Sequence, residues 1–251
     1  MLPSALWGRS SGSPYPSSVV RQQPEQQAPP VQRLRIRYAK RGRLRFTSHR
    51  DFSRAFERAV ARARVPMAYS SGFNPHPRIS YAGAAPTGAA SEAEYVEIAL
   101  ADVVDPAAVR SALVEALPAG LDVLEVVESS GGSLADLLQA SSWLIDVPLE
   151  LSTVEPAVAR FLAAPEVLVE RMTKKGLRSF DARGAVVSLT AAEAASGSRL
   201  ELLLRHGVPA VRPDDVMTGL GLSLGTALPL YTRLAQGPFD EATGTIGDPL
   251  G

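Results

Sequence analysis

The chain has 251 residues, 45% of them hydrophobic, and its 26 basic side chains balance 26 acidic ones to a formal net charge of zero. Cysteine is absent, which excludes disulfides, cysteine-ligated zinc, iron–sulfur clusters and thiol nucleophiles. No apolar run reaches the roughly 18 residues of a membrane-spanning helix, so a cytoplasmic protein without a membrane contact is expected. The three histidines lie far apart in the sequence, and no metal ion or other cofactor is predicted.

The two ends of the chain differ in composition from the middle. Residues 1–30 are rich in Ser, Pro and Gln and offer little that a core would bury, so we expect a disordered tail. Pro3 and its polar neighbours interrupt any apolar segment, and no signal peptide is predicted. Residues 237–251 are expected to form a second, loose tail.

Positive charge is concentrated in residues 33–64, which hold twelve Lys or Arg and only two acids. Such a local excess in a neutral chain predicts a surface for an anionic partner. Arg33–Lys40 alternates between basic and apolar residues, which predicts a half-buried strand with an outer arginine side. Arg43–Phe46 is expected to return as the second strand of a basic hairpin, with Arg43 and Arg45 on the arginine side.

A capped helix is predicted after the hairpin. Ser48 and Asp51 have the spacing of a capping box, and apolar residues recur at helical spacing over Phe52–Ala63. The opposite face carries arginines at four-residue intervals, namely Arg50, Arg54, Arg58 and Arg62. Like charges at this spacing destabilise a helix. Because the four arginines also adjoin the predicted basic hairpin, we favour anion binding over a merely solvated face. His49 is expected to contact the substrate, whereas capping accounts for Ser48 and Asp51 better than catalysis does.

The sequence YSSGFNPHP, residues 69–77, is dense in turn-forming residues. Two hypotheses remain open for it. In one, its aromatic and polar side chains stack on and contact unpaired bases. In the other, Phe73 plugs the core and the loop is merely rigid. The contact residues under the first hypothesis are Tyr69, Phe73, Asn74 and His76.

The rest of the pattern predicts an α+β fold of two tandem ferredoxin-like units, residues 31–130 and 131–236. The boundary is placed at a Gly/Ser-rich linker, residues 128–133, and a short helix over Leu134–Gln139. A strand at Val186–Thr190 is interpreted as an addition to the second unit. The other expected elements are strands at Arg78–Tyr81, Glu94–Leu100, Leu121–Val127, Trp143–Leu149, Val167–Met172, Arg199–Arg205 and Leu228–Leu234, and helices at Asp105–Leu117, Glu155–Ala164 and Arg212–Leu220.

A second basic segment, Arg171–Arg183, holds five basic residues and one acid. One hypothesis assigns it contacts with a phosphate backbone. The other makes it a solvated hairpin tip in which Asp181 pairs with Arg183. The candidate contact residues are Lys174, Lys175, Arg178 and Arg183.

Several of these segments together resemble a known family. The residues that carry the resemblance are Phe46-x-Ser48-His49-x-Asp51, Gly72-Phe73-Asn74-Pro75-His76-Pro77, Ala90-Ser91-Glu92-x-Glu94-Tyr95, Arg178-x-Phe-Asp181-x-Arg183 and Val211-Arg212-Pro213-Asp214. The chain is similar, over Leu34–Leu234, to the radical SAM-associated (radical SAM-linked) family, a domain of unknown function. It departs from that family at Arg50, where an apolar residue is usual, and at residues 85–88, where a leucine-containing loop is usual.

The resemblance implies the stand-alone form of this domain, acting beside a separately encoded radical SAM protein. It supplies no catalytic residues, so no activity of the chain alone is expected. Two hypotheses for the basic face stay open. The chain is either a non-catalytic RNA-binding accessory module, acting in RNA or ribosome-related modification, or a subunit that docks on the radical SAM partner without touching nucleic acid.

Overall fold

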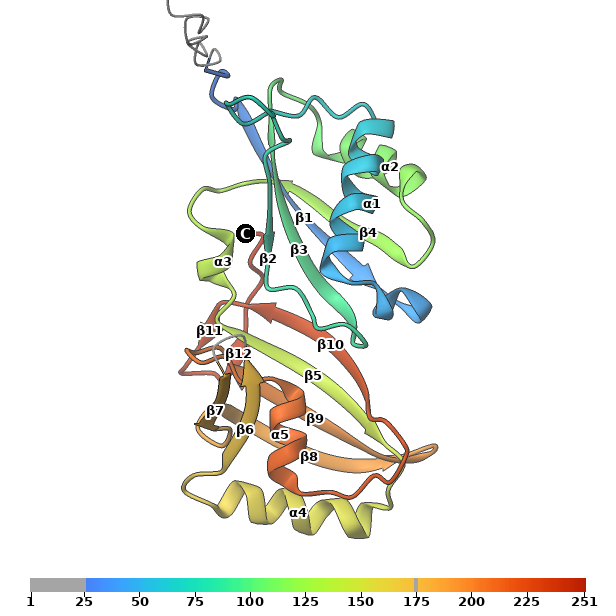
Figure 1. Ribbon diagram of the computed structural model, residues 1–251, viewed down its shortest axis with the longest axis vertical. Coiled ribbons are helices and arrows are strands. Elements are labelled where there is room, and N and C mark those ends of the chain that lie inside the picture. Colours follow the sequence, from blue (N-terminus) through green and yellow to red (C-terminus); the bar gives the residue numbers. More distant parts are fainter. Residues whose placement is uncertain (1–25, 174–175) are drawn as a thin grey trace, which may run out of the picture.

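The computed structural model describes residues 26–173 and 176–251 (Figure 1). Lys174, Lys175 and most of the predicted N-terminal tail therefore lie outside the described residues. The predicted α+β class is confirmed, because helices pack on an eight-stranded sheet that runs through the whole described chain. None of these helices is long and apolar enough to cross a membrane.

The first half of the sheet has the strand order β4-β1-β3-β2, and each neighbouring pair is antiparallel. Its core lies between these strands and the helices α1 and α2. The elements in chain order are β1 (Gln32–Lys40), the 3-10 helix η1 (Gly42–Phe46), α1 (His49–Arg62), β2 (Ile79–Ala82), β3 (Ala90–Leu100), α2 (Pro106–Ala116) and β4 (Leu121–Glu128).

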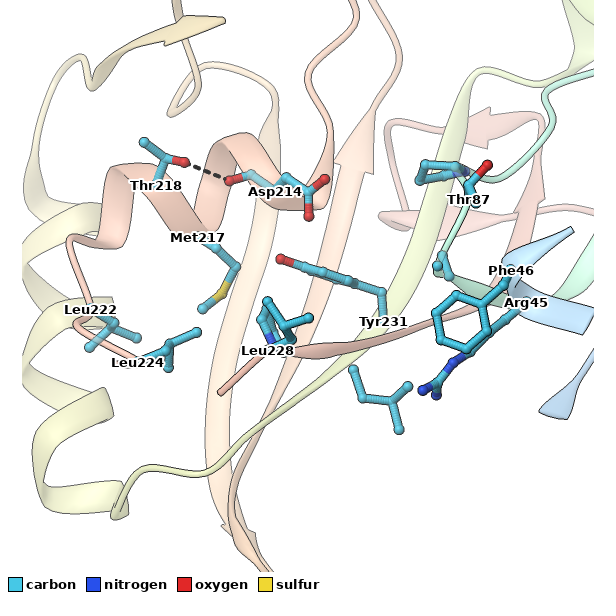
Figure 2. A pocket seen from close by; sticks show the side chains of 15 residues that line it. Arg45, Phe46, Thr87, Asp214, Met217, Thr218, Leu222, Leu224, Leu228 and Tyr231 are labelled. Atoms are coloured by element: carbon cyan, nitrogen blue, oxygen red, sulfur yellow. Dashed lines mark hydrogen bonds between the residues drawn. The ribbon is translucent and has the colours of Figure 1, made fainter. Parts of the chain in front are cut away.

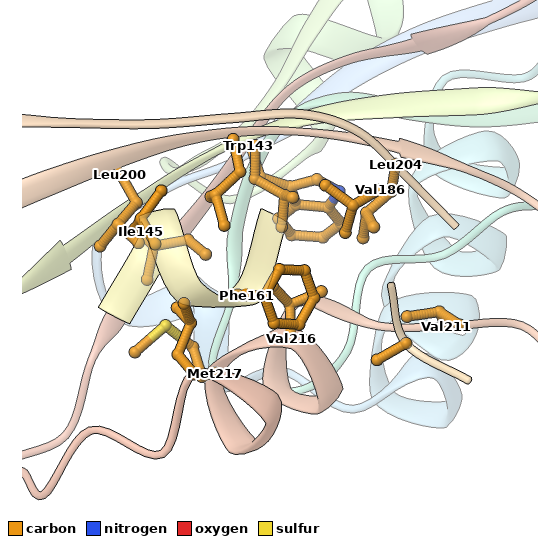
Figure 3. Packing of buried hydrophobic residues seen from close by; sticks show 14 of the residues in the cluster. Trp143, Ile145, Phe161, Val186, Leu200, Leu204, Val211, Val216 and Met217 are labelled. Carbon is orange, nitrogen blue, oxygen red and sulfur yellow. The ribbon is translucent and has the colours of Figure 1, made fainter. Parts of the chain in front are cut away.

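The second half repeats this relative order as β10-β5-β9-β8, again with antiparallel neighbours. Its core gathers Trp143, Phe161 and Val216 between the sheet, α4 and α5 (Figure 3). The elements are α3 (Leu134–Leu137), β5 (Ala140–Val147), α4 (Leu151–Ala163), β6 (Leu168–Thr173), β7 (Gly176–Asp181), β8 (Val186–Ala194), β9 (Gly197–Arg205), α5 (Pro213–Leu220) and β10 (Leu230–Gly237).

The shared order supports the two ferredoxin-like units, which stay a prediction, but one detail differs from expectation. The strand at Val186 is an integral member of the sheet, and the added element is instead the separate hairpin β6–β7. In addition, β3 and β10 pair in parallel, with Ala90 opposite Thr232 and Ser91 opposite Arg233. We call this junction of the two halves the seam.

The predicted basic hairpin is wrong. Arg43–Phe46 forms η1 and not a returning strand. The reason lies in the topology: β1 already has β3 on one edge and β4 on the other, so no edge remains for a hairpin partner. Gly42, with φ of 54°, turns the chain away from the sheet at this point.

The predicted arginine side of β1 is only partly exposed: Arg33 is exposed and Arg37 half-buried, but Arg35 is buried. Arg35 has 0% exposure, and its Nε donates to Glu97 Oε2 on β3 at 3.1 Å. Its two terminal nitrogens donate to backbone carbonyls of Gly131 and Pro249. The linker after β4 and the C-terminal residues thus cover this face at Arg35, so the middle of β1 is buried on both sides.

The C-terminal residues are therefore not the loose tail that their composition predicts. They contain a small antiparallel pair, β11 (Phe239–Asp240) with β12 (Thr245–Ile246). Leu250 is buried in a cluster that contains Tyr95 of β3 and Leu134 of α3. This cluster packs on the face of the first half that α1 and α2 leave uncovered.

Candidate functional site

The arginines at four-residue intervals on α1, which we call the basic row (Arg50, Arg54, Arg58 and Arg62), are all exposed. Within the described residues the guanidinium groups of the first three form no salt bridge or hydrogen bond. Arg62 differs, because its Nη1 donates to the carbonyl of Ala116 at 3.3 Å. That carbonyl belongs to the last turn of α2, where the helix itself supplies no donor. The free cations are thus Arg50, Arg54 and Arg58.

The N-terminus of α1 is capped, although not through a full capping box. Ser48 Oγ accepts the backbone N–H of Asp51 at 3.2 Å and lies 2.7 Å from Asp51 Oδ2, to which its hydroxyl donates. The Asp51 carboxylate thus binds the Ser48 hydroxyl instead of the backbone N–H. His49 is exposed and packs edge-on against the Tyr81 ring, with centroids 5.0 Å apart. Ser48 and Asp51 are occupied with each other, and His49 is free to contact a ligand.

The loop at residues 69–77 is closed at its base. Ser70 N–H donates to His76 O at 2.9 Å, and His76 N–H donates to Ser70 Oγ at 3.0 Å. Phe73 is 67% exposed, so it does not plug the core, and the exposed Tyr69, Asn74 and His76 lie on the same loop. The loop follows α1 and lies at the end of the molecule away from the second half (Figure 1).

The second predicted basic segment does not join the basic row. Arg178 is exposed on β7, in the half of the molecule that does not contain α1 (Figure 1). Arg183 is half-buried and donates to the carbonyls of Leu162 and Val186 at 3.2 and 3.0 Å. Its guanidinium therefore stabilises the fold and is poorly placed for a phosphate.

Asp181 does not form the expected pair with the Arg183 guanidinium. Burial acts to raise the pKa of Asp181, but backbone N–H groups of Val167, Gly184 and Arg183 donate to its carboxylate, and the net effect is a lowered pKa. The carboxylate fixes the turn that follows β7. Arg183 and Asp181 of the second basic segment therefore have structural roles. Arg178 is exposed, and Lys174 and Lys175 lie outside the described residues.

Arg43 and Arg45 lie in η1, Arg43 exposed and Arg45 half-buried. Arg45 stands over the ring of Phe46 at 4.7 Å from its centroid. This stacked pair borders a cavity of about 570 Å³ between the two halves, which we call the seam cavity (Figure 2). Its lining residues are Arg45, Phe46, Pro86, Thr87, Gly88, Ala89, Asp214, Met217, Thr218, Leu222, Leu224, Leu228, Pro229, Leu230 and Tyr231.

Tyr231 and Asp214 supply polar groups on the second-half wall of the seam cavity (Figure 2). Burial raises the pKa of the Tyr231 hydroxyl, and the neighbouring Asp214 carboxylate raises it further, so the hydroxyl stays protonated. Asp214 is exposed and forms no salt bridge with any described residue. The sequence analysis placed Asp214 in a motif of the family resemblance and near the start of a predicted helix. No local pattern connects it with Arg45, which lies 169 positions earlier.

A buried polar network lies at the seam, where Ser91 pairs with Arg233. The Arg233 guanidinium binds Glu94 of β3, donates to Ser91 Oγ at 3.2 Å, and stands 5.4 Å from the centre of the Trp143 ring. Ser91 and Glu94 belong to the Ala90–Tyr95 motif noted in the sequence. That motif thus joins the two halves of the sheet.

Three further polar groups at the seam continue this network. Trp143 Nε1 donates to Ser141 Oγ at 2.8 Å, and Ser141 Oγ lies 2.8 Å from His206 Nε2. His206 Nδ1 lies 2.7 Å from the carbonyl of Leu138, to which it can only donate. Burial lowers the pKa of His206, with Arg233 adding to the effect, so the neutral ring is favoured. Across the described residues, no three His, Asp or Glu side chains gather as a metal site.

Comparisons with known proteins place the chain among uncharacterized sequences. A sequence model described as "Uncharacterized protein conserved in bacteria (DUF2344)" matches residues 33–213. No curated protein matches the chain. A solved chain titled "Crystal Structure of a Cbf5-Nop10-Gar1 Complex" is similar with 11% sequence identity and a TM-score of 0.44. The similarity covers 88% of the present chain and 57% of the solved chain. A likeness this weak carries no argument about function.

Proposed function

The chain belongs to the DUF2344 family of uncharacterized bacterial proteins, whose description supplies no function. From the surface of the chain itself, we propose that it is a non-catalytic RNA-binding accessory module. The single observation that carries the proposal is the set of free cations on α1, Arg50, Arg54 and Arg58. The motif resemblance supports a separately encoded radical SAM protein in the cytoplasm as the partner that performs the chemistry.

The spacing of the basic row suits a phosphate backbone. Successive arginines of the row are about 6 Å apart along the helix axis, close to the separation of neighbouring phosphates in a nucleic-acid strand. The like charges destabilise α1 when no anion is present, and bound phosphates would relieve that repulsion. Arg50 extends the row by one position at the place where the sequence departs from the family pattern.

The loop at residues 69–77 supports RNA over a generic polyanion. Phe73 is exposed, and the hydrogen bonds between Ser70 and His76 fix the loop that presents it. An exposed aromatic ring on a fixed loop is typical of proteins that stack unpaired bases. A partner bound through charge alone would leave Phe73 without a role.

The proposal is tested by measuring RNA affinity against salt concentration. Binding that depends on phosphate contacts weakens as salt rises, and removing one such contact lowers the log–log slope by about 0.7 to 0.9. Changing Arg54 and Arg58 to Gln is therefore expected to reduce the slope by about 1.5. Phe73→Ala is expected to weaken binding by about 1–3 kcal/mol with the slope unchanged, because stacking releases no counterions.

The matched control removes two exposed arginines from the other half of the molecule. Arg160 donates to Leu220 O and Arg205 pairs with Glu241 at the surface, so changing both to Gln alters the net charge equally. This control is expected to leave the slope unchanged. A wild-type protein with no RNA affinity at low salt contradicts the proposal. If the Arg54/Arg58 variant then fails to co-purify with the radical SAM protein, the basic row is a protein-docking face instead.

A further inference from the structure

The seam cavity has two walls of different character. Figure 2 shows Phe46 and Arg45 on one side, and Asp214, Met217 and Tyr231 on the other, with Leu228 beside the Tyr231 ring. Its volume of about 570 Å³ lies within the range of small-ligand sites, which runs from roughly 300 to 1,000 Å³. Phe46 and Leu228 are 59% and 87% exposed, so folding alone leaves much of the apolar surface here uncovered.

The charges of the lining residues restrict the ligand. Arg45 offers a cation on the first-half wall, and its contact in the described chain is with the Phe46 ring. Asp214 offers an acceptor-only carboxylate on the second-half wall, which accepts a hydrogen bond from the Tyr231 hydroxyl and has lone pairs left for a ligand. The Phe46 ring lies on the Arg45 side of the cavity and the Tyr231 ring on the Asp214 side (Figure 2). A complementary ligand has a flat ring, hydrogen-bond donors on one edge and an anionic group.

We propose that the seam cavity binds a guanine nucleotide, with the base against Phe46 and Tyr231, its donor edge toward Asp214 and its phosphate toward Arg45. Guanine presents two adjacent donors, N1–H and the 2-amino group, which both oxygens of one carboxylate can accept. Adenine and cytosine place a ring acceptor next to their amino group. Uracil places carbonyl oxygens on both sides of its single N–H, so a carboxylate repels this edge.

The cavity lies next to the start of the basic row. Arg45 is in η1, and only residues 47 and 48 separate η1 from α1. An RNA strand held along α1 would therefore bring a nucleotide to this cavity, and in this form the inference rests on the proposed function. The guanine nucleotide could be a free nucleotide or part of an RNA strand, because both present the same base edge and phosphate. The two arms of the experiment distinguish these two ligands.

The first arm titrates the full chain with GMP, AMP, CMP and UMP by calorimetry. GMP is expected to bind at least about fivefold more tightly than UMP, since one bidentate pair at a base edge discriminates by this factor or more. Asp214→Asn is expected to abolish the preference, because its amide replaces one acceptor by a donor. Asp102→Asn, an exposed aspartate outside the cavity, is the matched control and keeps it. Phe46→Ala is expected to weaken all four nucleotides.

The second arm compares oligouridylate with the same oligomer carrying one central guanine. The guanine oligomer is expected to bind at least about fivefold more tightly, with the same salt slope, and Asp214→Asn removes the difference. If both oligomers bind with a salt slope but show no guanine preference, and GMP binds no better than UMP, the cavity inference is overturned and the proposed function stands. If neither oligomer binds while GMP is preferred in an Asp214-dependent manner, the cavity inference holds for free nucleotide and the proposed function fails.

Discussion

The arginines exposed on α1 and the two arginines buried in the sheet, Arg35 and Arg233, have opposite environments. Arg50, Arg54 and Arg58 face solvent without an acidic partner in the described chain, whereas Arg35 and Arg233 are buried and each binds a glutamate of β3. A row of arginines on a surface helix costs stability and leaves charge for a ligand. A buried arginine is stabilised by the groups that surround it, and its guanidinium is not accessible to a ligand.

The comparison is tested most severely by removing the charge of Glu94. Glu94→Gln leaves the Arg233 guanidinium buried without its anion, which is expected to lower the free energy of unfolding by about 3–5 kcal/mol. Glu92→Gln is the matched control on the same strand, because Glu92 pairs with Arg41 at the surface, where a salt bridge contributes about 0–1 kcal/mol. Urea denaturation of both variants measures the difference. Equal losses would show that burial does not separate the two pairs.

The seam is also expected to respond to pH through His206. Burial holds the pKa of His206 below its ordinary 6.5, so below this pH the unfolded chain binds a proton that the folded protein does not. The free energy of unfolding should therefore fall as pH drops through about 6.5, by at most about 1.4 kcal/mol per pH unit. His206→Gln should remove this part of the pH dependence in denaturation between about pH 7.5 and pH 5.5. An unchanged slope would contradict the buried, neutral ring.

The smallest effect is expected on α1, with the opposite sign. Arg54 has Arg50 and Arg58 four residues away on either side, and each like-charge pair destabilises the helix by about 0.2–0.5 kcal/mol. Arg54→Gln, which keeps the helix propensity, should thus raise the free energy of unfolding by about 0.4–1 kcal/mol. The gain should shrink at high salt, which screens exposed charges. A loss of stability would mean that Arg54 has an internal partner.

Local patterns predicted the helical half of the candidate site well. The apolar spacing of Phe52, Phe56 and Val60 placed α1 and its exposed face, because a helix decides with its own residues which side is buried. The turn-forming residues of 69–77 likewise placed the loop. Whether Phe73 pointed inward or outward was left open, because that depends on what packs beside the loop.

Residue patterns on strands were less informative about exposure, because segments distant in the sequence can cover the second face of a strand. Arg35 alternates with apolar residues, a pattern that predicts exposure, yet the linker and the C-terminal residues cover it. The seam cavity was missed for a similar reason. Arg45 comes from the first half and Asp214 and Tyr231 from the second, and the two halves meet at the parallel pairing of β3 with β10.

The hydrogen bond from Arg35 to the carbonyl of Pro249 spans 214 positions, from the first strand to nearly the last described residue. During synthesis on the ribosome, β1 emerges early and its guanidinium remains hydrated until that carbonyl leaves the exit tunnel. The first half thus cannot bury Arg35 while the second half is still being made. Contacts this distant in sequence slow folding, and this one makes the burial of Arg35 depend on residues that follow the second half.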